Sequence, residues 1–422
     1  MLKSEKSPQT QRGEPRRWVL ICGLVRDESS MLNKLAELAA WKDEGVIDGV
    51  VFSTWHGEIS KYPAVMARFE AGDFDLVEIE QPKIKSFGYT LHQSKTLYYG
   101  LQAIPDGVAV LKIRPDLGAL NTQTRNAIQN VDLTLERPEG WPPIFQSKVL
   151  LTASFIDTPF YLNDIIFFGM KADLLRLASF EFSTEMILAN TAPEQFFFRG
   201  AFANQFPLLE SYLTVQPYLV YDDPERSEQR ISTLLASDYY LDVLALNLRF
   251  IKTYFRIGII DPIERDSLPD PTPDFTITSL FHTPRAVAGI AFLAGPHAVM
   301  ASDERAIDAL LEGRFARDAL GTRFVAALER TADPAYWLSF DTNPLRPNAQ
   351  VRELQDRIHT IMPELLDRLD SRKDPAGRHF VIRGHSDRVG LTVESDETQK
   401  LHEEINHMRR QLDALRAGKR RF

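Results

Sequence analysis

Four short apolar runs alternate with amphipathic stretches between residues 18 and 113, and this alternation constrains the fold more than any other feature of the sequence. The runs are rich in Val, Ile and Leu, whereas the stretches between them repeat apolar residues at helical spacing, as at Leu32, Leu35 and Leu38. We predict strands at 18–25, 46–54, 74–79 and 108–113, and helices at 31–43, 62–70 and 91–103. This order predicts an α/β fold with a mostly parallel sheet and flanking helices.

Three of the predicted strands end in polar clusters. The carboxyl ends of parallel strands meet at one edge of a sheet, and ligands of open α/β sheets bind outside that edge. We therefore expect the clusters to lie together and to form a ligand site. They comprise Arg26, Asp27 and Glu28, then Ser53, Thr54 and Trp55, and then Arg114, Pro115 and Asp116.

The sequence lacks the glycine-rich phosphate loops of dinucleotide-binding and P-loop proteins, so another group has to neutralise any bound phosphate. Asp116, directly after a buried strand, either begins a turn or binds a hard divalent cation that holds the phosphate. Lys112 lies two residues before Arg114 and therefore on the same face of the strand. These two basic side chains either bind phosphate or form a buried ion pair.

The remaining chain is expected to form a disordered tail (1–16), a first domain (17–225), a mainly helical region (226–390) and a terminal amphipathic helix (391–422). Within the first domain, the stretch 160–169 holds an apolar strand that follows the pair Asn163–Asp164 and ends at Gly169, and a helix begins near Pro193 and Glu194. A buried helix is predicted at 239–257, with further helices at 303–329 and 350–369.

The terminal helix carries apolar residues at coiled-coil spacing over barely two heptads, so it either packs on the body of the protein or mediates homo-oligomerisation. Its basic tip, residues 418–422, is either a solvated tail or a weak contact with an anionic membrane surface.

Composition limits the function. The chain has 422 residues and a net charge of −9, which disfavours nucleic acid as a partner. Cys22 is the single cysteine, in an apolar strand, so a disulfide framework is excluded and a reducing compartment is favoured. The first 17 residues have no apolar core typical of a signal peptide, and no apolar run reaches the ~18 residues that span a bilayer. We expect a cytoplasmic protein, with peripheral contact at the inner face of the membrane as the alternative.

Five segments resemble the WavE family of glycosyltransferases in lipopolysaccharide and capsule biosynthesis, and they occur in the family's order. They are Val25-Arg-Asp-Glu28, Val51-Phe-Ser-Thr-Trp-His-Gly-Glu58, Gly88-Tyr-Thr-Leu-His-Gln-Ser-Lys-Thr-Leu-Tyr-Tyr-Gly-Leu101, Leu111-Lys-Ile-Arg-Pro-Asp-Leu117 and Asn163-Asp-Ile-Ile-Phe-Phe-Gly169. The resemblance covers residues 18–200 and implies a GT-A-like, Rossmann-type fold. It also implies a nucleotide-sugar donor, a glycan or glycolipid acceptor and Mn²⁺ or Mg²⁺.

The resemblance implies roles for individual residues. Asp116 matches the last acidic residue of the Asp-x-Asp motif and is the expected metal ligand, whereas Arg114 replaces the first acidic residue and would contact the diphosphate. Asp164 and Glu194 are the two candidates for the base that takes the proton of the acceptor hydroxyl group, if the reaction inverts the anomeric centre. The expected donor-binding residues are Arg26, Glu28, Ser53, Thr54, Trp55, His92, Gln93, Lys112 and Arg114.

Several of these residues have an alternative structural role. Trp55 either stacks on the donor or packs in the core, and His92 either helps to bind phosphate at a helix start or packs inside. Arg26 and Glu28 either bind the nucleoside or form a loop salt bridge. For the protein as a whole, the alternative is a catalytically inactive sugar-nucleotide-binding or scaffold subunit.

Overall fold

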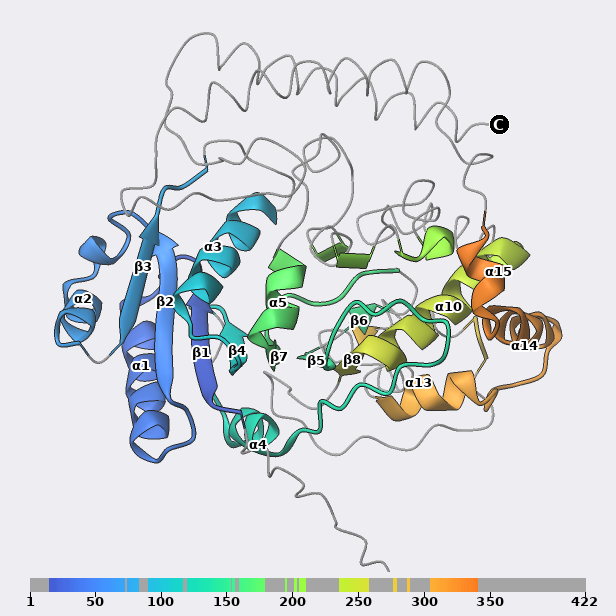
Figure 1. The fold of residues 1–422 in the computed structure, drawn as a ribbon, viewed down its shortest axis with the longest axis horizontal. Coiled ribbons are helices and arrows are strands. Elements are labelled where there is room, and N and C mark those ends of the chain that lie inside the picture. Colours follow the sequence, from blue (N-terminus) through green and yellow to red (C-terminus); the bar gives the residue numbers. More distant parts are fainter. Residues whose placement is uncertain are drawn as a thin grey trace, which may run out of the picture.

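The computed structural model describes residues 15–72, 74–82, 90–116, 120–152, 154–155, 159–178, 194–195, 201–202, 205–209, 235–257, 276–278, 287–288 and 304–340 (Figure 1). Several predicted segments lie outside these described residues. They are most of the tail at 1–16, the helix at 350–369 and the terminal helix at 391–422.

A mixed, mostly parallel sheet forms the centre of the described structure, which confirms the α/β class. In the described residues it has seven strands in the order β3-β2-β1-β4-β7-β5-β8. β7 runs antiparallel to its neighbours β4 and β5, and the other pairs are parallel. The bounds are β1 Arg17–Cys22, β2 Gly49–Trp55, β3 Asp75–Ile79, β4 Ala109–Ile113, β5 Val149–Leu151, β7 Phe167–Met170 and β8 Phe255–Ile257. A small second sheet pairs β6 (Ser154–Phe155) with β9 (Val287–Ala288).

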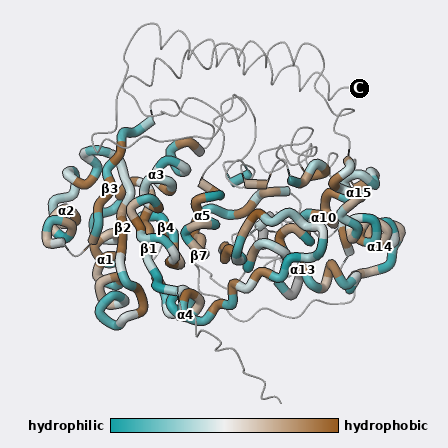
Figure 2. The backbone as a smooth tube through the Cα atoms, viewed as in Figure 1, coloured by the Kyte–Doolittle hydropathy of each residue, from teal (hydrophilic) through white to brown (hydrophobic). Residues whose placement is uncertain are grey.

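Helices cover both faces of the sheet, because each strand sends alternate apolar side chains to opposite sides. Helices α1 (Glu28–Asp43), α2 (Pro63–Glu70) and α4 (Thr122–Asn130) share one buried cluster with strand residues such as Val19 and Phe52. Helices α3 (Thr90–Ala103) and α5 (Lys171–Ala178) share the other with Leu20 and Val110. A short 3₁₀ helix, η1 (Ile59–Lys61), precedes α2. Figure 2 shows hydrophobic and hydrophilic stretches alternating along α1 and α2, as expected for helices that bury one face.

Two local features set the positions of α1 and α3. The side chain of Asp27 caps α1 by accepting a hydrogen bond from the Ser30 amide at 2.6 Å, so the helix begins earlier than the predicted residue 31. Gly100 lets α3 approach β1 closely, because a Cβ atom at this position would lie 2.4 Å from Cδ1 of Leu20. A side chain there would require either Leu20 or the helix to shift.

The sheet extends past residue 225, the expected end of the first domain. The predicted helix at 239–257 is instead α10 (Asp238–Tyr254) followed by β8, which pairs with β5. The predicted helix at 303–329 is two helices, α13 (Glu304–Leu311) and α14 (Ala319–Thr331), and α15 (Pro334–Leu338) follows. The break follows from Gly313, whose φ of 72° ends α13, and from Asp318, whose side chain caps α14. None of the described helices is long and apolar enough to cross a membrane.

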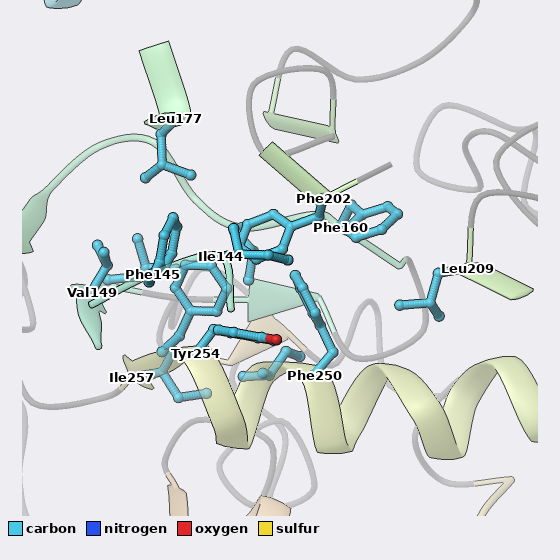
Figure 3. Close-up of a cluster of buried hydrophobic side chains, with 14 of the residues drawn as sticks. Ile144, Phe145, Val149, Phe160, Leu177, Phe202, Leu209, Phe250, Tyr254 and Ile257 are labelled. Atoms are coloured by element: carbon cyan, nitrogen blue, oxygen red, sulfur yellow. The ribbon is translucent and has the colours of Figure 1, made fainter. Parts of the chain in front are cut away.

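An aromatic cluster joins α10 to the segment that leads into β7 (Figure 3). The rings of Phe202 and Phe250 lie 4.7 Å apart, and Phe160 packs edge-on against Phe250 at 5.1 Å between ring centroids. Phe160 is fully buried and has a φ of 60°, a left-handed conformation that a bulky side chain rarely adopts. The surrounding rings hold this strained residue in place, four residues before Asp164.

Candidate functional site

The three strands that carry the predicted polar clusters end at one edge of the sheet. Strands β1, β2 and β4 are mutually parallel, so their carboxyl ends share an edge, and the chain leaves β1 towards β2 on one side and returns to β4 on the other. This reversal is a topological switch point, where open α/β sheets bind ligands. Because β7 is antiparallel to β4, with Phe167 paired to Lys112, its amino end lies at the same edge. The residues just before β7, including Asp164, therefore join the site.

The turn after β4 presents an arginine and an aspartate that bind each other. Nε of Arg114 donates to Oδ1 of Asp116 at 3.0 Å, and Nη2 donates to Oδ2 at 2.8 Å. Both side chains are about a quarter to a third exposed. Burial acts to raise the pKa of Asp116, but the hydrogen bonds and charge of Arg114, with the charge of Arg26, hold it below its ordinary value. Arg26, an exposed residue, thus lies within electrostatic range of this turn.

Two buried lysines support the site, one from each face of the sheet. Lys34 of α1 donates to the main-chain oxygens of Arg114 and Pro115, each at 2.9 Å. On the opposite face, Lys112 donates to the main-chain oxygen of Asp164, and its Nζ lies 4.7 Å from the ring centroid of Phe167. Burial lowers the pKa of both lysines, to about 8 for Lys34. At 4% exposure, Lys112 is placed to hold Asp164 rather than to reach solvent.

The adjacent residues Asn163 and Asp164 have different roles. Oδ1 of Asn163 accepts hydrogen bonds from the amide of Ile165 at 2.9 Å and from Oγ1 of Thr152 at 3.2 Å, so Asn163 builds the turn. The Asp164 side chain is 2% exposed, and its Oδ2 has no hydrogen-bond partner among the described residues. A buried carboxylate oxygen without a partner is costly, and such groups are found where a ligand binds.

Glu194 is the second carboxylate of the site. Burial, followed by the negative charge of Asp164, raises the pKa of Glu194 to about 7, although a hydrogen bond from Tyr161 and the charge of Arg114 lower it. Its neighbour Gln195 is fully buried and donates to the main-chain oxygen of Pro159 at 3.0 Å, which ties residues 194–195 to the chain before β7. A carboxylate with a pKa near neutrality is suited to general base catalysis.

The structure places other predicted donor-binding residues inside the fold. Ser53 and Thr54 are fully buried, and Trp55 packs edge-on against His92 in the core with ring centroids 5.5 Å apart. Oε1 of Glu28 accepts from the amide of Ala64 at 3.2 Å, so Glu28 joins α1 to the start of α2. Ser53, Thr54 and Trp55 therefore support the edge as part of the packed core and are not exposed on it. Gln93, next to His92 on α3, is partly exposed.

Lys34 and Tyr161 are site residues that the sequence analysis missed. Lys34 lies on the apolar face of α1 with Met31 and Leu38, three and four residues away, and a lysine on such a face is a detectable signal. Tyr161 had no distinguishing pattern around it.

The predicted metal fits only in part. Mg²⁺ is commonly held by one or two carboxylates together with phosphate oxygens, and Asp116 provides one carboxylate. However, Arg114 engages both oxygens of Asp116, and the described residues contain no group of three or more His, Cys, Asp or Glu residues that could hold a metal ion. A cation at Asp116 would have to displace Arg114.

The edge thus defines an α/β protein with a charged site at the switch point of its sheet. Comparison of the chain with protein-family models, with curated proteins and with solved structures gives no significant match.

Proposed function

We propose that this protein is a GT-A-like glycosyltransferase that moves a sugar from a nucleotide-sugar donor to a glycan or glycolipid acceptor of the cell surface. The observation that carries the proposal is the pair of carboxylates, Asp164 and Glu194, beside the Arg114–Asp116 pair at the switch point. Charges of both signs at this edge suit a reaction in which a diphosphate departs and a hydroxyl group attacks. The order of the motifs from residue 25 to residue 169 supports the same reading.

In this proposal Glu194 is the general base. Its pKa of about 7 lets it lose its proton to water near neutral pH and then accept one from the acceptor hydroxyl group. Asp164 raises the basicity of Glu194, and the unpartnered Oδ2 of Asp164 accepts a hydrogen bond from a sugar hydroxyl group. Lys112 and Asn163 hold Asp164 in place.

Arg114 binds the diphosphate of the donor, since its guanidinium group matches two phosphate oxygens at once. Mn²⁺ or Mg²⁺ remains part of the proposal, with Asp116 as its ligand, and would stabilise negative charge on the leaving diphosphate. When Arg114 turns to the diphosphate, Asp116 becomes free to bind the cation.

A thermal-shift screen of nucleotide-sugars, with and without Mn²⁺ or Mg²⁺, tests the proposal. A ligand at 100 times its Kd should stabilise the protein by ~2.7 kcal/mol. Asp116→Ala should abolish the metal-dependent part of the shift. Asp43→Ala, at an exposed position at the end of α1, is the matched control and should leave the shift unchanged. A full shift in Asp116→Ala would remove Asp116 from the metal role.

The second candidate function is a sugar-nucleotide-binding or scaffold subunit without catalytic activity. The bidentate contact between Arg114 and Asp116 favours this second function, because the contact occupies the carboxylate that the metal-assisted reaction needs. Donor hydrolysis assays with the same ligands distinguish the two functions. Metal-independent binding without turnover would support the subunit and contradict the enzyme.

We further propose that the protein acts in the cytoplasm, with peripheral membrane contact through residues 418–422, which lie outside the described residues. Sedimentation with anionic vesicles, compared between the full chain and a chain ending at residue 417, tests the contact.

A further inference from the structure

Lys34 occupies a position where an apolar residue would be expected. It lies on the face of α1 that packs under the sheet, among Met31, Leu35 and Leu38, and is 3% exposed. Lysine is almost never fully buried without partners, because its ammonium group loses its hydration. The interactions that Lys34 makes must therefore account for its presence.

Lys34 interacts with the turn after β4, which begins 80 positions further along the chain. The ladder between β1 and β4 ends at the pair Ile21 and Ile113, so the carbonyl groups of Arg114 and Pro115 lie beyond it. Buried carbonyl groups need a donor, and Nζ of Lys34 donates to both at 2.9 Å. One ammonium group thus fixes the two peptide planes on either side of Pro115.

The turn is also held from the side of β1. Gly23 has a φ of 122°, and a Cβ atom there would lie 3.5 Å from Cδ of Pro115, so the end of β1 passes directly beside the turn. Gly23 thus lies close to one side of the turn, and Lys34 donates hydrogen bonds to it from α1. Arg114 and Asp116 of this turn carry the charged side chains of the switch point.

We propose that Lys34 is a positioning residue, which holds the turn from Arg114 to Asp116 so that Arg114 faces a bound diphosphate and Asp116 faces the cation that would accompany it. The nature of that ligand rests on the proposed function, whereas the hold on the turn does not. Lys34 itself contacts main-chain oxygens of the turn and acts on the ligand through Arg114 and Asp116.

The test removes the ammonium group and then restores it chemically. Lys34→Cys is alkylated with 2-bromoethylamine, which rebuilds a side chain of nearly the length of lysine with a terminal ammonium group. Position 34 is 3% exposed and Cys22 is 6% exposed, so both thiols react only after unfolding. Cys22 is therefore replaced by Ala in every protein of the series, and alkylation is done in denaturant before refolding. The Cys22→Ala parent treated in the same way is the control, and Lys34→Met supplies an apolar side chain of similar length.

Two measurements are made on each protein. The first is amide hydrogen exchange in the peptide that covers residues 109–116, which needs no ligand. The second is the Kd for inorganic pyrophosphate, with and without Mg²⁺. We expect Lys34→Met and unmodified Lys34→Cys to exchange faster in this peptide and to bind pyrophosphate about 10-fold or more weakly, a loss typical of supporting residues around a site. Aminoethylation should restore both values.

Unchanged exchange in Lys34→Met would overturn the inference. Faster exchange with pyrophosphate binding equal to that of the wild type would overturn the role in ligand positioning. If the wild type binds no pyrophosphate, the proposed function and the ligand role fail together, and exchange still decides whether Lys34 holds the turn. Should Lys34→Met not fold, Lys34→Arg retains a donor for both carbonyl groups and is expected to fold and to bind pyrophosphate more weakly than the wild type.

Discussion

Replacing Glu194 by Gln should stabilise the protein at alkaline pH and remove its activity. Gln keeps the shape of the side chain and its ability to hydrogen bond to Tyr161, but it carries no charge. In the native state, burial and the charge of Asp164 raise the pKa of Glu194 from 4.5 to about 7. That shift means that the ionised side chain costs ~3 kcal/mol in the native state relative to the unfolded chain. Because Glu194 is partly exposed, we expect a measured gain of ~1–3 kcal/mol on substitution.

The sign of the pH dependence follows from the raised pKa. Above pH 7 the side chain is ionised in both states, so the full cost is present. As the pH falls from 7 towards 4.5, the native state binds a proton that the unfolded state does not, and the cost is relieved. The advantage of Glu194→Gln should therefore be greatest at pH 8.5 and should fall below ~1 kcal/mol at pH 5.

Guanidinium denaturation of both proteins at the two pH values measures this difference, provided that the dependence of the unfolding free energy on denaturant is the same for both. Glu70→Gln, an exposed residue at the end of α2, is the matched control and should show no gain at either pH. Loss of a general base should also reduce turnover ~10²–10⁴-fold. A variant that is no more stable than the wild type at pH 8.5, or that gains equally at both pH values, would refute the reasoning.

Three further predictions concern the same edge of the sheet and helix α3. Burial and then the charge of Asp164 raise the pKa of Glu194, and Asp164→Asn removes the second cause, so the acid limb of the pH–activity profile should move to lower pH, and an unmoved limb would count against their coupling. Lys112→Met should leave the unfolding free energy within ~1–2 kcal/mol of wild type but reduce turnover ~10–100-fold, because it releases the main chain at Asp164, and wild-type turnover would contradict this. Gly100→Ala should destabilise the protein by ~1–3 kcal/mol in thermal denaturation through its overlap with Leu20, and an unaltered melting temperature would show that α3 can shift freely.

The sequence alone determined the class of the sheet and the edge at which charged residues gather. Apolar runs such as 108–113 alternate with stretches of helical spacing, and this alternation can be recognised from local sequence without the tertiary structure. Since β1, β2 and β4 are parallel, the residues after them had to share one edge. The placement of Arg114 and Asp116 there followed from order and period, with no knowledge of packing.

Other features were decided only by tertiary structure. β8 has three residues, too few to show a period, and pairing with β5 makes it a strand. The burial of Trp55 depends on α3, because His92 of that helix packs against its ring. The burial of Ser53 and Thr54 likewise reflects helices on both faces of β2.

The chemistry of the site shows the same division. Residue types at 112, 164 and 194 identified ionisable groups, but a pKa depends on which charges and how much water surround a group after folding. Glu194 acquires its raised pKa from burial and from Asp164, 30 positions away, and Lys34 finds its carbonyl partners 80 positions away. Local sequence gives no measure of such distant contacts, because they arise when separate segments converge at the switch point of the sheet.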